Sequence, residues 1–558
     1  MPPSPGGAAA AAPDAPARPA ADSGRSARRP SAWIRLGERP RQSRVVRALA
    51  AVAAAAGVTG VVARFVAPPE LWLDEAQSVA IARLPLPDLL AALRQDGSPP
   101  LYYLLLHAWT ALFGSGATAV RALSAVLSVL TLPLAWHLAR RLAGRRVAVA
   151  LVVLLATSPF AIRYASETRM YSLLAFLTVL GAVAVVAVLR RDGAGPVLGL
   201  GAVTGALLLT HLWSFHLVAV TGLLALAALR TRRRAASRVL TGLALGLLLF
   251  TPWVPSLLVQ VTHTGTPWAE PPGLLALPMA LDAWRGGGAV RAHALGTALL
   301  LLAALGALAV PAARRPGSPT VLLRLRLRPS RAVLLALSAG TLVVAGLVSR
   351  LTGTAVADRY TSVALVAFLA LVATGVAALP GTRARAVGLA LVAVLGVATA
   401  VPGLTAPRTQ AGQVARALAD AGPGDVVVTC PDQLGPALAR LVPPDLDLVV
   451  YPDLRPADRV DWTDYVDRVT GTPSATVAAE VLERAGDAGI WVVTGLGYRV
   501  PSPGRCGALV ETLAAVRDEP DLVVAADARI PESDRLQYFP PVPAAEPARR
   551  SAGVGAAG

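Results

Sequence analysis

Uninterrupted apolar stretches of roughly 17–21 residues recur along most of this 558-residue chain. Coiled as an α-helix, each stretch can cross about 30 Å of hydrocarbon, where every backbone N–H and C=O must be hydrogen-bonded within the protein. Charged residues make up 15% of the chain and the mean hydropathy is +0.57, whereas ordinary globular proteins carry about 25% charge. We therefore expect an α-helical polytopic membrane protein.

The chain is strongly basic, with a formal net charge of +18. In a soluble protein this charge would suggest a nucleic-acid partner. Here the arginines cluster between the apolar stretches, which is typical of membrane loops, so no nucleic-acid partner is expected. The chain has no lysine and is rich in alanine, which is typical of a GC-rich bacterial genome such as that of an actinomycete.

The apolar stretches predict about eleven transmembrane helices. We place them at 46–66, 119–139, 146–163, 171–189, 195–213, 214–230, 238–256, 294–313, 331–350, 361–380 and 384–403. One further block, Pro99–Gly114, is apolar but short. If it crossed the membrane, the orientation of everything after it would be inverted.

The arginines decide between these two arrangements. Without Pro99–Gly114 as a span, the loops alternate between an arginine-rich set and a set that holds most of the loop acids. The first set has a single acid, Asp192, and contains Arg140, Arg141, Arg145, Arg146, Arg190, Arg191, Arg230, Arg232, Arg233, Arg234, Arg238, Arg314, Arg315, Arg324, Arg326, Arg328, Arg331, Arg383 and Arg385. By the positive-inside rule this set and the basic N-terminus are cytoplasmic. Pro99–Gly114 then lies in the first outer loop, as a helix in the membrane interface.

Eleven spans place the C-terminal region outside the cytoplasm, and the pattern of apolar residues changes there. Apolar runs shorten to strand length at 425–429, 446–450, 490–494 and 522–525, with helical stretches between them. This alternation predicts a small α/β domain. The predicted organisation is a disordered cytoplasmic N-terminus at 1–45, a transmembrane domain at 46–404 with its first outer loop at 67–118, an extracytoplasmic α/β domain at 405–543 and a disordered tail at 544–558.

The only cysteines, Cys430 and Cys506, both fall in the predicted outer domain. A disulfide is permitted outside the cytoplasm. Two buried free thiols are the alternative, and the sequence leaves both open.

Unusual charges gather at the outer ends of the predicted helices. Asp74 and Glu75 follow the first span within ten residues, and the other candidates are Arg121, Glu167, Arg169, Tyr171, His211 and Arg359. Taken singly, Arg121 is typical of an interface anchor, the acid pair of a helix cap and His211 of a satisfied helix-end residue. Together, the acids and arginines on one face offer both a base and an anion site, and arginine suits phosphate because its planar fork donates two hydrogen bonds.

Several motifs resemble those of the GT-C membrane glycosyltransferases. They are WLDEAQS at 72–78, SPPLYYLLLHAW at 98–109, RALSA at 121–125, ATSPFAIRYASETRMYSLL at 156–174 and DRYTSVALVAFLAL at 358–371. The chain is similar over about 45–380 to bacterial family 39 proteins, which are themselves similar to protein O-mannosyltransferases and to the lipid A aminoarabinose transferase. Ser98 stands where many members have histidine, and Ser166 where glutamine is frequent. An acceptor contact or metal that relies on that histidine is therefore not indicated here.

The resemblance implies transfer of mannose or another sugar from a polyprenyl-phosphate donor to a hydroxyl of a protein, glycan or lipid acceptor outside the cytoplasm. The residues agree with this, because a carboxylate can take the proton of the attacking hydroxyl and fixed cations can stabilise the departing phosphate. We expect Asp74 to be the general base and Glu75 to orient it or hold the acceptor. The donor phosphate is assigned to Arg169 with Arg359 or Arg121, and Glu167 is expected to orient Arg169 or touch the sugar. Tyr102, Tyr103 and Trp268 are candidates for stacking on sugar or lipid, and direct displacement implies inversion.

Two other functions fit a chain of this kind. A lipid-linked glycan flippase or transporter would show internal repeats and charges near the membrane midplane, and neither is evident. A non-enzymatic assembly or sensor protein would use the outer domain as its working part. No metal signature is present, although Asp74 and Glu75 could share a divalent cation, with His211 as a distant ligand.

Overall fold

The computed structural model describes residues 43–542, except for 265–275, 312–322, 326, 355, 497, 499–501 and 503. The termini that the sequence predicts to be disordered lie almost wholly outside the described residues. Trp268, a predicted stacking residue, also lies outside them. Residues from Arg44 onward belong to one structural unit.

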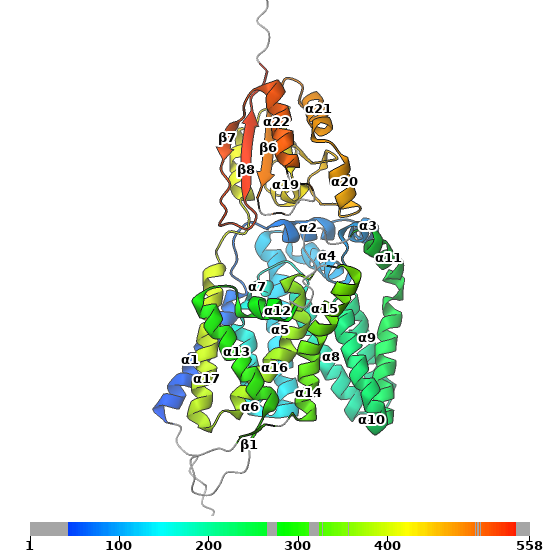
Figure 1. Ribbon diagram of the computed structural model, residues 1–558, viewed down its shortest axis with the longest axis vertical. Coiled ribbons are helices and arrows are strands. Elements are labelled where there is room, and N and C mark those ends of the chain that lie inside the picture. Colours follow the sequence, from blue (N-terminus) through cyan, green and yellow to red (C-terminus); the bar gives the residue numbers. More distant parts are fainter. Residues whose placement is uncertain are drawn as a thin grey trace, which may run out of the picture. The chain divides into compact units, whose positions relative to one another are not determined.

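Helices dominate this unit up to about residue 400, and a mixed sheet follows (Figure 1). The helices are α1 (Arg44–Ala63), α2 (Leu73–Ala82), α3 (Leu86–Asp96), α4 (Leu101–Phe113), α5 (Ala117–Ala143), α6 (Arg145–Thr157), α7 (Pro159–Ala165), α8 (Tyr171–Arg190), α9 (Ala194–Leu208), α10 (Ser214–Phe250), α11 (Val254–His263), α12 (Ala276–Arg285), α13 (Val290–Leu308), α14 (Pro329–Leu335), α15 (Thr341–Thr352), α16 (Ser362–Ala378) and α17 (Gly381–Ala400). Two short strands, β1 (Ala309–Pro311) and β2 (Leu323–Leu325), pair between α13 and α14.

A multi-pass membrane protein is confirmed by the length and hydropathy of these helices. Within the described residues, eight are long and apolar enough to cross a membrane, or nine if the bent pair α6–α7 forms one span. Two further predicted spans correspond to the 15-residue helix α9 and to the second half of α10, which leaves helical geometry at Arg232. The predicted number of eleven spans therefore remains a prediction.

Residues 67–118, which the sequence predicts to be the first outer loop, contain three short helices, α2, α3 and α4. At 13 residues, α4 is about 20 Å long, too short to cross the hydrocarbon core. It packs against α2 and α5, as expected for a helix that stays at one side of the membrane. α3 has the sequence signals of a short independent helix: Pro87 and Asp88 in its first turn, Arg94 in its last, and Gly97 with φ of 81° closing it.

Close helix packing depends on small residues at α13 and α16. A Cβ atom on Gly306 would lie 1.9 Å from the carbonyl oxygen of Leu371, and one on Gly375 would lie 1.9 Å from the carbonyl oxygen of Leu302. Any larger side chain would have to push the two helices apart. In a membrane, where lipid is as apolar as the helices, such close contact is a main source of helix association.

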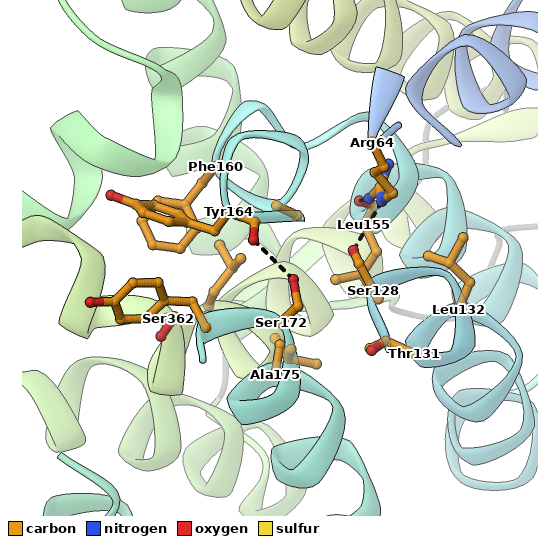
Figure 2. Close-up of a pocket in the computed structure, with 14 residues that line it drawn as sticks. Arg64, Ser128, Thr131, Leu132, Leu155, Phe160, Tyr164, Ser172, Ala175 and Ser362 are labelled. Carbon is orange, nitrogen blue, oxygen red and sulfur yellow. Dashed lines mark hydrogen bonds between the residues drawn. The ribbon is translucent and has the colours of Figure 1, made fainter. Parts of the chain in front are cut away.

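A break between α6 and α7 is stabilised by a buried arginine. Pro159 has no N–H to offer the carbonyl of Leu155, and the two helices meet at an angle of 56°. Arg64 donates instead to the carbonyl oxygens of Leu155 at 2.7 Å and Ala156 at 2.8 Å, and to the hydroxyl of Ser128 at 2.9 Å. Figure 2 shows the hydrogen bond between Arg64 and Ser128. Both residues line a cavity of about 30 Å³. Arg64 thus satisfies carbonyls that the break leaves without a helical partner.

The C-terminal region contains a six-stranded mixed sheet in the order β5-β4-β3-β6-β8-β7. β3 lies parallel to β4 and β6, whereas β8 is antiparallel to both β6 and β7. The elements are α18 (Ala411–Ala417), β3 (Val426–Cys430), α19 (Gly435–Ala439), β4 (Asp447–Val450), β5 (Arg455–Pro456), α20 (Tyr465–Gly471), α21 (Ser474–Ala485), β6 (Ile490–Gly495), α22 (Arg505–Arg517), β7 (Asp521–Val524) and β8 (Asp534–Phe539). The predicted α/β character and all four predicted strands are confirmed. β8 was not predicted, although its sequence DRLQYF alternates polar and apolar residues as a half-buried strand does.

Cys430 and Cys506 form a disulfide, which settles the alternative that the sequence left open. Their Cα atoms lie 5.5 Å apart, and the bond joins the end of β3 to the start of α22. It closes the crossover that includes β4, α20 and α21. A disulfide in this position fits a domain outside the cytoplasm.

We expect cysteines placed at the two ends of the helical part to differ in accessibility. Arg233→Cys lies in an arginine-rich segment and should be shielded from an impermeant thiol reagent added to intact cells. Gly288→Cys, in the turn between α12 and α13, should be labelled. The native cysteines are paired and should not react. Labelling of the first position but not of the second would show that the orientation is reversed.

Burial raises the pKa of Asp432 to about 7, and the hydroxyl of Tyr465 donates to its Oδ1 at 2.8 Å. The folded domain therefore binds more protons than the unfolded chain between about pH 4 and pH 7, and its stability should fall as the pH rises through this window. Asp432→Asn, which keeps the acceptor, should weaken this dependence. Hydrogen exchange of β3 at pH 5 and pH 8 measures it. The exposed Asp467→Asn is the control, and an unchanged dependence in Asp432→Asn would contradict the assignment.

Candidate active site

The acid pair predicted from the sequence lies in the first turn of α2. A carboxylate is favoured there because the free N–H groups make that end of a helix positive. Since Asp74 and Glu75 are consecutive, they point in different directions around the helix. The structure gives them different surroundings, and this difference separates their chemistry.

Asp74 faces two arginines from distant parts of the chain. Its Oδ2 atom lies 3.8 Å from Nε of Arg169, which follows α7, and 3.7 Å from Nη2 of Arg359, which precedes α16. These separations are those of ion pairs and are longer than hydrogen bonds. The carboxylate is partly exposed, with 16% of its side chain accessible. Asp74 therefore remains reachable while two cations stand beside it.

Glu75, in contrast, is fully buried and engaged on both oxygens. Arg121 donates to Oε1 at 2.7 Å and to Oε2 at 2.6 Å, and the backbone N–H of Thr168 donates to Oε1 at 2.9 Å. The remaining donors of Arg121 bond to the carbonyl oxygens of Pro68 and Glu70. Arg121 is thus committed to Glu75 and to the chain that leads into α2. This geometry favours a structural role for Arg121 over contact with a donor phosphate.

Arg169 is held against α2 and α4 by three contacts from one nitrogen. Its Nη1 donates to Ser78 Oγ at 3.0 Å, to the carbonyl oxygen of Asp74 at 3.3 Å and to the hydroxyl of Tyr103 at 3.4 Å. Three buried polar atoms around it, Asp74 Oδ2, Arg169 Nε and the hydroxyl of Tyr171, have no hydrogen-bond partner among the described residues. Buried polar groups are almost always hydrogen-bonded. An unsatisfied base, donor and hydroxyl in one place indicate a site for a polar ligand.

Aromatic rings form one side of this site. Tyr171 contacts His211 with ring centroids 5.9 Å apart, and His211 contacts Tyr360 at 4.9 Å. Tyr164 and Trp213 extend the row. The backbone N–H of Trp213 donates to Nδ1 of His211 at 3.1 Å. The turn that contains His211 therefore fixes its position, which agrees with the interpretation of His211 as a satisfied helix-end residue. Its ring lies against those of Tyr171 and Tyr360.

The partners of Tyr102 and Glu167 differ from those expected from the sequence. Tyr102 is fully buried and shares a hydrogen bond of 3.2 Å with Ser124, whose hydroxyl in turn donates to the carbonyl of Arg169 at 3.1 Å. Glu167 pairs with Arg163 at 2.8 Å and with Arg408 at 3.2 Å. Among the described residues, the ion pairs of the Glu167 side chain are with these two arginines and not with Arg169, so its expected effect on Arg169 stays a prediction.

Arg408 is the main residue that sequence reasoning missed. It follows the last membrane helix, is 3% exposed, and lies between the two buried carboxylates, 3.8 Å from Glu75 Oε2 and 3.2 Å from Glu167 Oε1. It also donates to Ser166 Oγ at 3.0 Å. The available signal was its position just after a span, which is where the other functional charges are found.

A cavity of about 320 Å³ opens next to this cluster of charges. Its lining includes Arg163 and Arg408, the acids Asp282 and Asp358, and the rings of Phe160 and Tyr164. The volume is at the lower end of the range for small-molecule sites. Both hydrogen-bond acceptors and donors line it, together with aromatic surface.

A divalent cation shared by Asp74 and Glu75 remains a hypothesis. Within the described residues, no three His, Cys, Asp or Glu side chains come together as a metal site. Glu75 is one of the two proposed carboxylate ligands, and both of its oxygens already accept hydrogen bonds from Arg121.

The fold defines a class: the chain has the GT-C fold of membrane glycosyltransferases. It resembles ArnT from Cupriavidus metallidurans in the apo state, with a TM-score of 0.56, 15% identity and coverage of 89% of this chain and 98% of ArnT. ArnT bound to undecaprenyl phosphate gives a TM-score of 0.52, 14% identity and coverage of 88% and 98%. Residues 97–255 match the family described as dolichyl-phosphate-mannose-protein mannosyltransferase. No curated protein matches the chain.

We expect Glu75→Gln to destabilise the protein, because Arg121 would stay buried beside a neutral partner. Removing one member of a buried ion pair typically costs about 3–5 kcal/mol. Thermal unfolding of the purified protein measures the change. Asp192→Asn is a matched control, because its side chain is 73% exposed and pairs with arginines at the surface, where about 0–1 kcal/mol is expected. Equal midpoints for Glu75→Gln and the wild type would contradict the assignment.

Proposed function

We propose that this protein is a glycosyltransferase that moves a sugar from a polyprenyl-phosphate donor to an acceptor hydroxyl at the outer face of the membrane. The observation that carries the proposal is the meeting of Asp74 with Arg169 and Arg359 beside unsatisfied buried polar atoms. One carboxylate and two fixed cations are the groups that this transfer needs.

In the proposed reaction, Asp74 accepts the proton of the attacking hydroxyl. The oxygen of that hydroxyl forms the new bond to the anomeric carbon, while the bond from this carbon to the phosphate oxygen breaks. The lipid phosphate leaves with the bonding electrons, and Arg169 and Arg359 stabilise its charge. No proton has to be supplied to the leaving group, so a single base suffices. A single displacement inverts the configuration at the anomeric carbon.

The surroundings of the two acids support Asp74 rather than Glu75 as the base. Both oxygens of Glu75 already accept hydrogen bonds, from Arg121 and from Thr168. A carboxylate held in this way is a poor proton acceptor, because a proton would displace a charge-assisted hydrogen bond. Glu75 is better suited to fix the first turn of α2, and with it the direction of Asp74. Arg121 accordingly leaves the set of phosphate ligands and becomes a positioning residue.

A lipid-linked donor is supported by the likeness to ArnT, one structure of which has undecaprenyl phosphate bound. The aromatic row of Tyr171, His211 and Tyr360 offers surface for a sugar ring next to the arginines. The cavity of about 320 Å³ beside Arg408 offers space for an acceptor that carries hydroxyl groups. Mannose and a pentose are both compatible with this site, as are protein, glycan and lipid acceptors.

We expect Asp74→Asn and Arg169→Ala to fail in different ways. Asp74→Asn keeps the size of the side chain and removes the base, so transfer should fall by about 10²–10⁴-fold while binding of undecaprenyl phosphate stays near that of the wild type. Arg169→Ala removes a charge-assisted contact and should weaken binding of undecaprenyl phosphate by at least about tenfold. Purified protein in liposomes, supplied with labelled polyprenyl-phosphate sugars and a cell-envelope extract, measures transfer.

The exposed residues Asp88 and Arg291 provide matched controls. Asp88→Asn and Arg291→Ala should change neither the rate of sugar transfer nor the binding of undecaprenyl phosphate. Near-full turnover of Asp74→Asn would exclude Asp74 as the base and make Glu167 the next candidate. A flippase would move the labelled lipid across the liposome membrane without consuming it. Movement without consumption in the wild-type protein would overturn the proposed function.

A further inference from the structure

The C-terminal domain is joined to the candidate active site by a short backbone pairing. Thr409 and Glu532 form a parallel bridge in which the N–H of Glu532 donates to the carbonyl of Arg408 at 3.0 Å, and the N–H of Gln410 donates to the carbonyl of Glu532 at 3.0 Å. The first residues after the last membrane helix are thus fixed to the segment that leads into β8. The pairing places the side chains of Arg408 and Glu532 at the domain's contact with the outer loop.

From this junction Arg408 reaches between the two buried carboxylates. Its guanidinium lies near Glu75 and Glu167, and it also contacts the carbonyl and hydroxyl of Ser166. Without a cation there, the negative charges of Glu75 and Glu167 would repel each other at low dielectric. Arg408 therefore holds the turn that carries Arg169 against the helix that carries Asp74.

Leu73 anchors the start of α2 in the C-terminal domain. It is the first residue of α2, and its side chain belongs to the same buried apolar cluster as Val426, Ile490 and Phe539 of the sheet. Only 5% of Leu73 is exposed. The helix that carries Asp74 is therefore packed, at its first residue, into a core that lies far along the chain.

A third contact fixes the middle of α2. The side-chain Oε1 of Gln77 accepts from the N–H of Val460 at 2.9 Å, and its Nε2 faces the carbonyl of the same residue at 3.4 Å. The C-terminal domain therefore contacts α2 at Leu73, Glu75 and Gln77. These contacts surround Asp74 without involving it.

We propose that the C-terminal domain is a working part of the active site, in which Arg408 and Gln77 are positioning residues that hold α2 so that Asp74 faces the arginines. The inference rests on the proposed transferase activity. It assigns to the domain the task of fixing the direction of the base, and leaves substrate contact to the residues of the membrane part.

The test compares Arg408→Met with Arg408→Lys in the full-length protein. Methionine removes the cation between Glu75 and Glu167, and we expect kcat to fall about five- to tenfold while the affinity for undecaprenyl phosphate is unchanged. Lysine keeps the charge, so it should restore most of kcat. Hydrogen exchange of the peptide that covers α2 should be faster in Arg408→Met and near normal in Arg408→Lys. This second readout does not depend on any activity.

Gln77→Ala provides an independent variant, because it removes the hydrogen bond that Gln77 accepts from Val460. Asp447→Ala is the control, since its partner Arg484 lies at the surface of the same domain. Equal kcat in Arg408→Met and the wild type, or equal exchange of α2, would overturn the inference. A wild-type protein that transfers no sugar, combined with faster exchange of α2 in Arg408→Met, would overturn the proposed function and leave the contact intact.

Discussion

A buried negative charge at the edge of the membrane has to be neutralised where it stands, and the ion pair of Glu75 with Arg121 meets this requirement. Both oxygens of the carboxylate are bonded to one guanidinium, whose other donors hold the chain between α1 and α2. Because Arg121 lies in a long helix that packs against α6 and α8, the pair attaches the outer loop to the rigid part of the fold. The direction of Asp74 follows from this attachment.

The charges of the site fall into two kinds, and this division explains how one loop can be both stable and reactive. Glu75, Arg121, Glu167 and Arg408 are deeply buried and pair with one another. Asp74 is more exposed and meets its arginines only at ion-pair distance. A fully bonded group resists proton transfer, whereas an incompletely bonded one can exchange partners when a ligand arrives. In the proposed reaction, the buried network supports Asp74 without taking part in the proton transfer.

The sequence predicted much of this fold because membrane spans, loop charges and strand-length apolar runs are local signals. The helical membrane part, the α/β character of the outer domain and α4 as a helix too short to span were all predictable. The roles of Arg121 and Glu167 were not, because the sequence shows that a charge lies at a helix end but not which partner it meets. Arg408 was missed for a related reason: its contacts with Glu75 and Glu167 join segments hundreds of residues apart. Arg64 was hidden inside a predicted span, where only the broken helix α6–α7 explains it.

The distance along the chain between α2 and its partners has a consequence for biosynthesis. A membrane protein is inserted as it is made, and its N-terminal segments fold first. Asp74 therefore emerges from the ribosome long before Arg408 and Val460 exist, and their contacts with α2 form only when the last domain has folded and closed the bond between Cys430 and Cys506. A nascent or truncated chain would carry the acid pair on a helix that lacks these contacts. Completion of the chain, rather than insertion of its first helices, would then be the event that assembles the site.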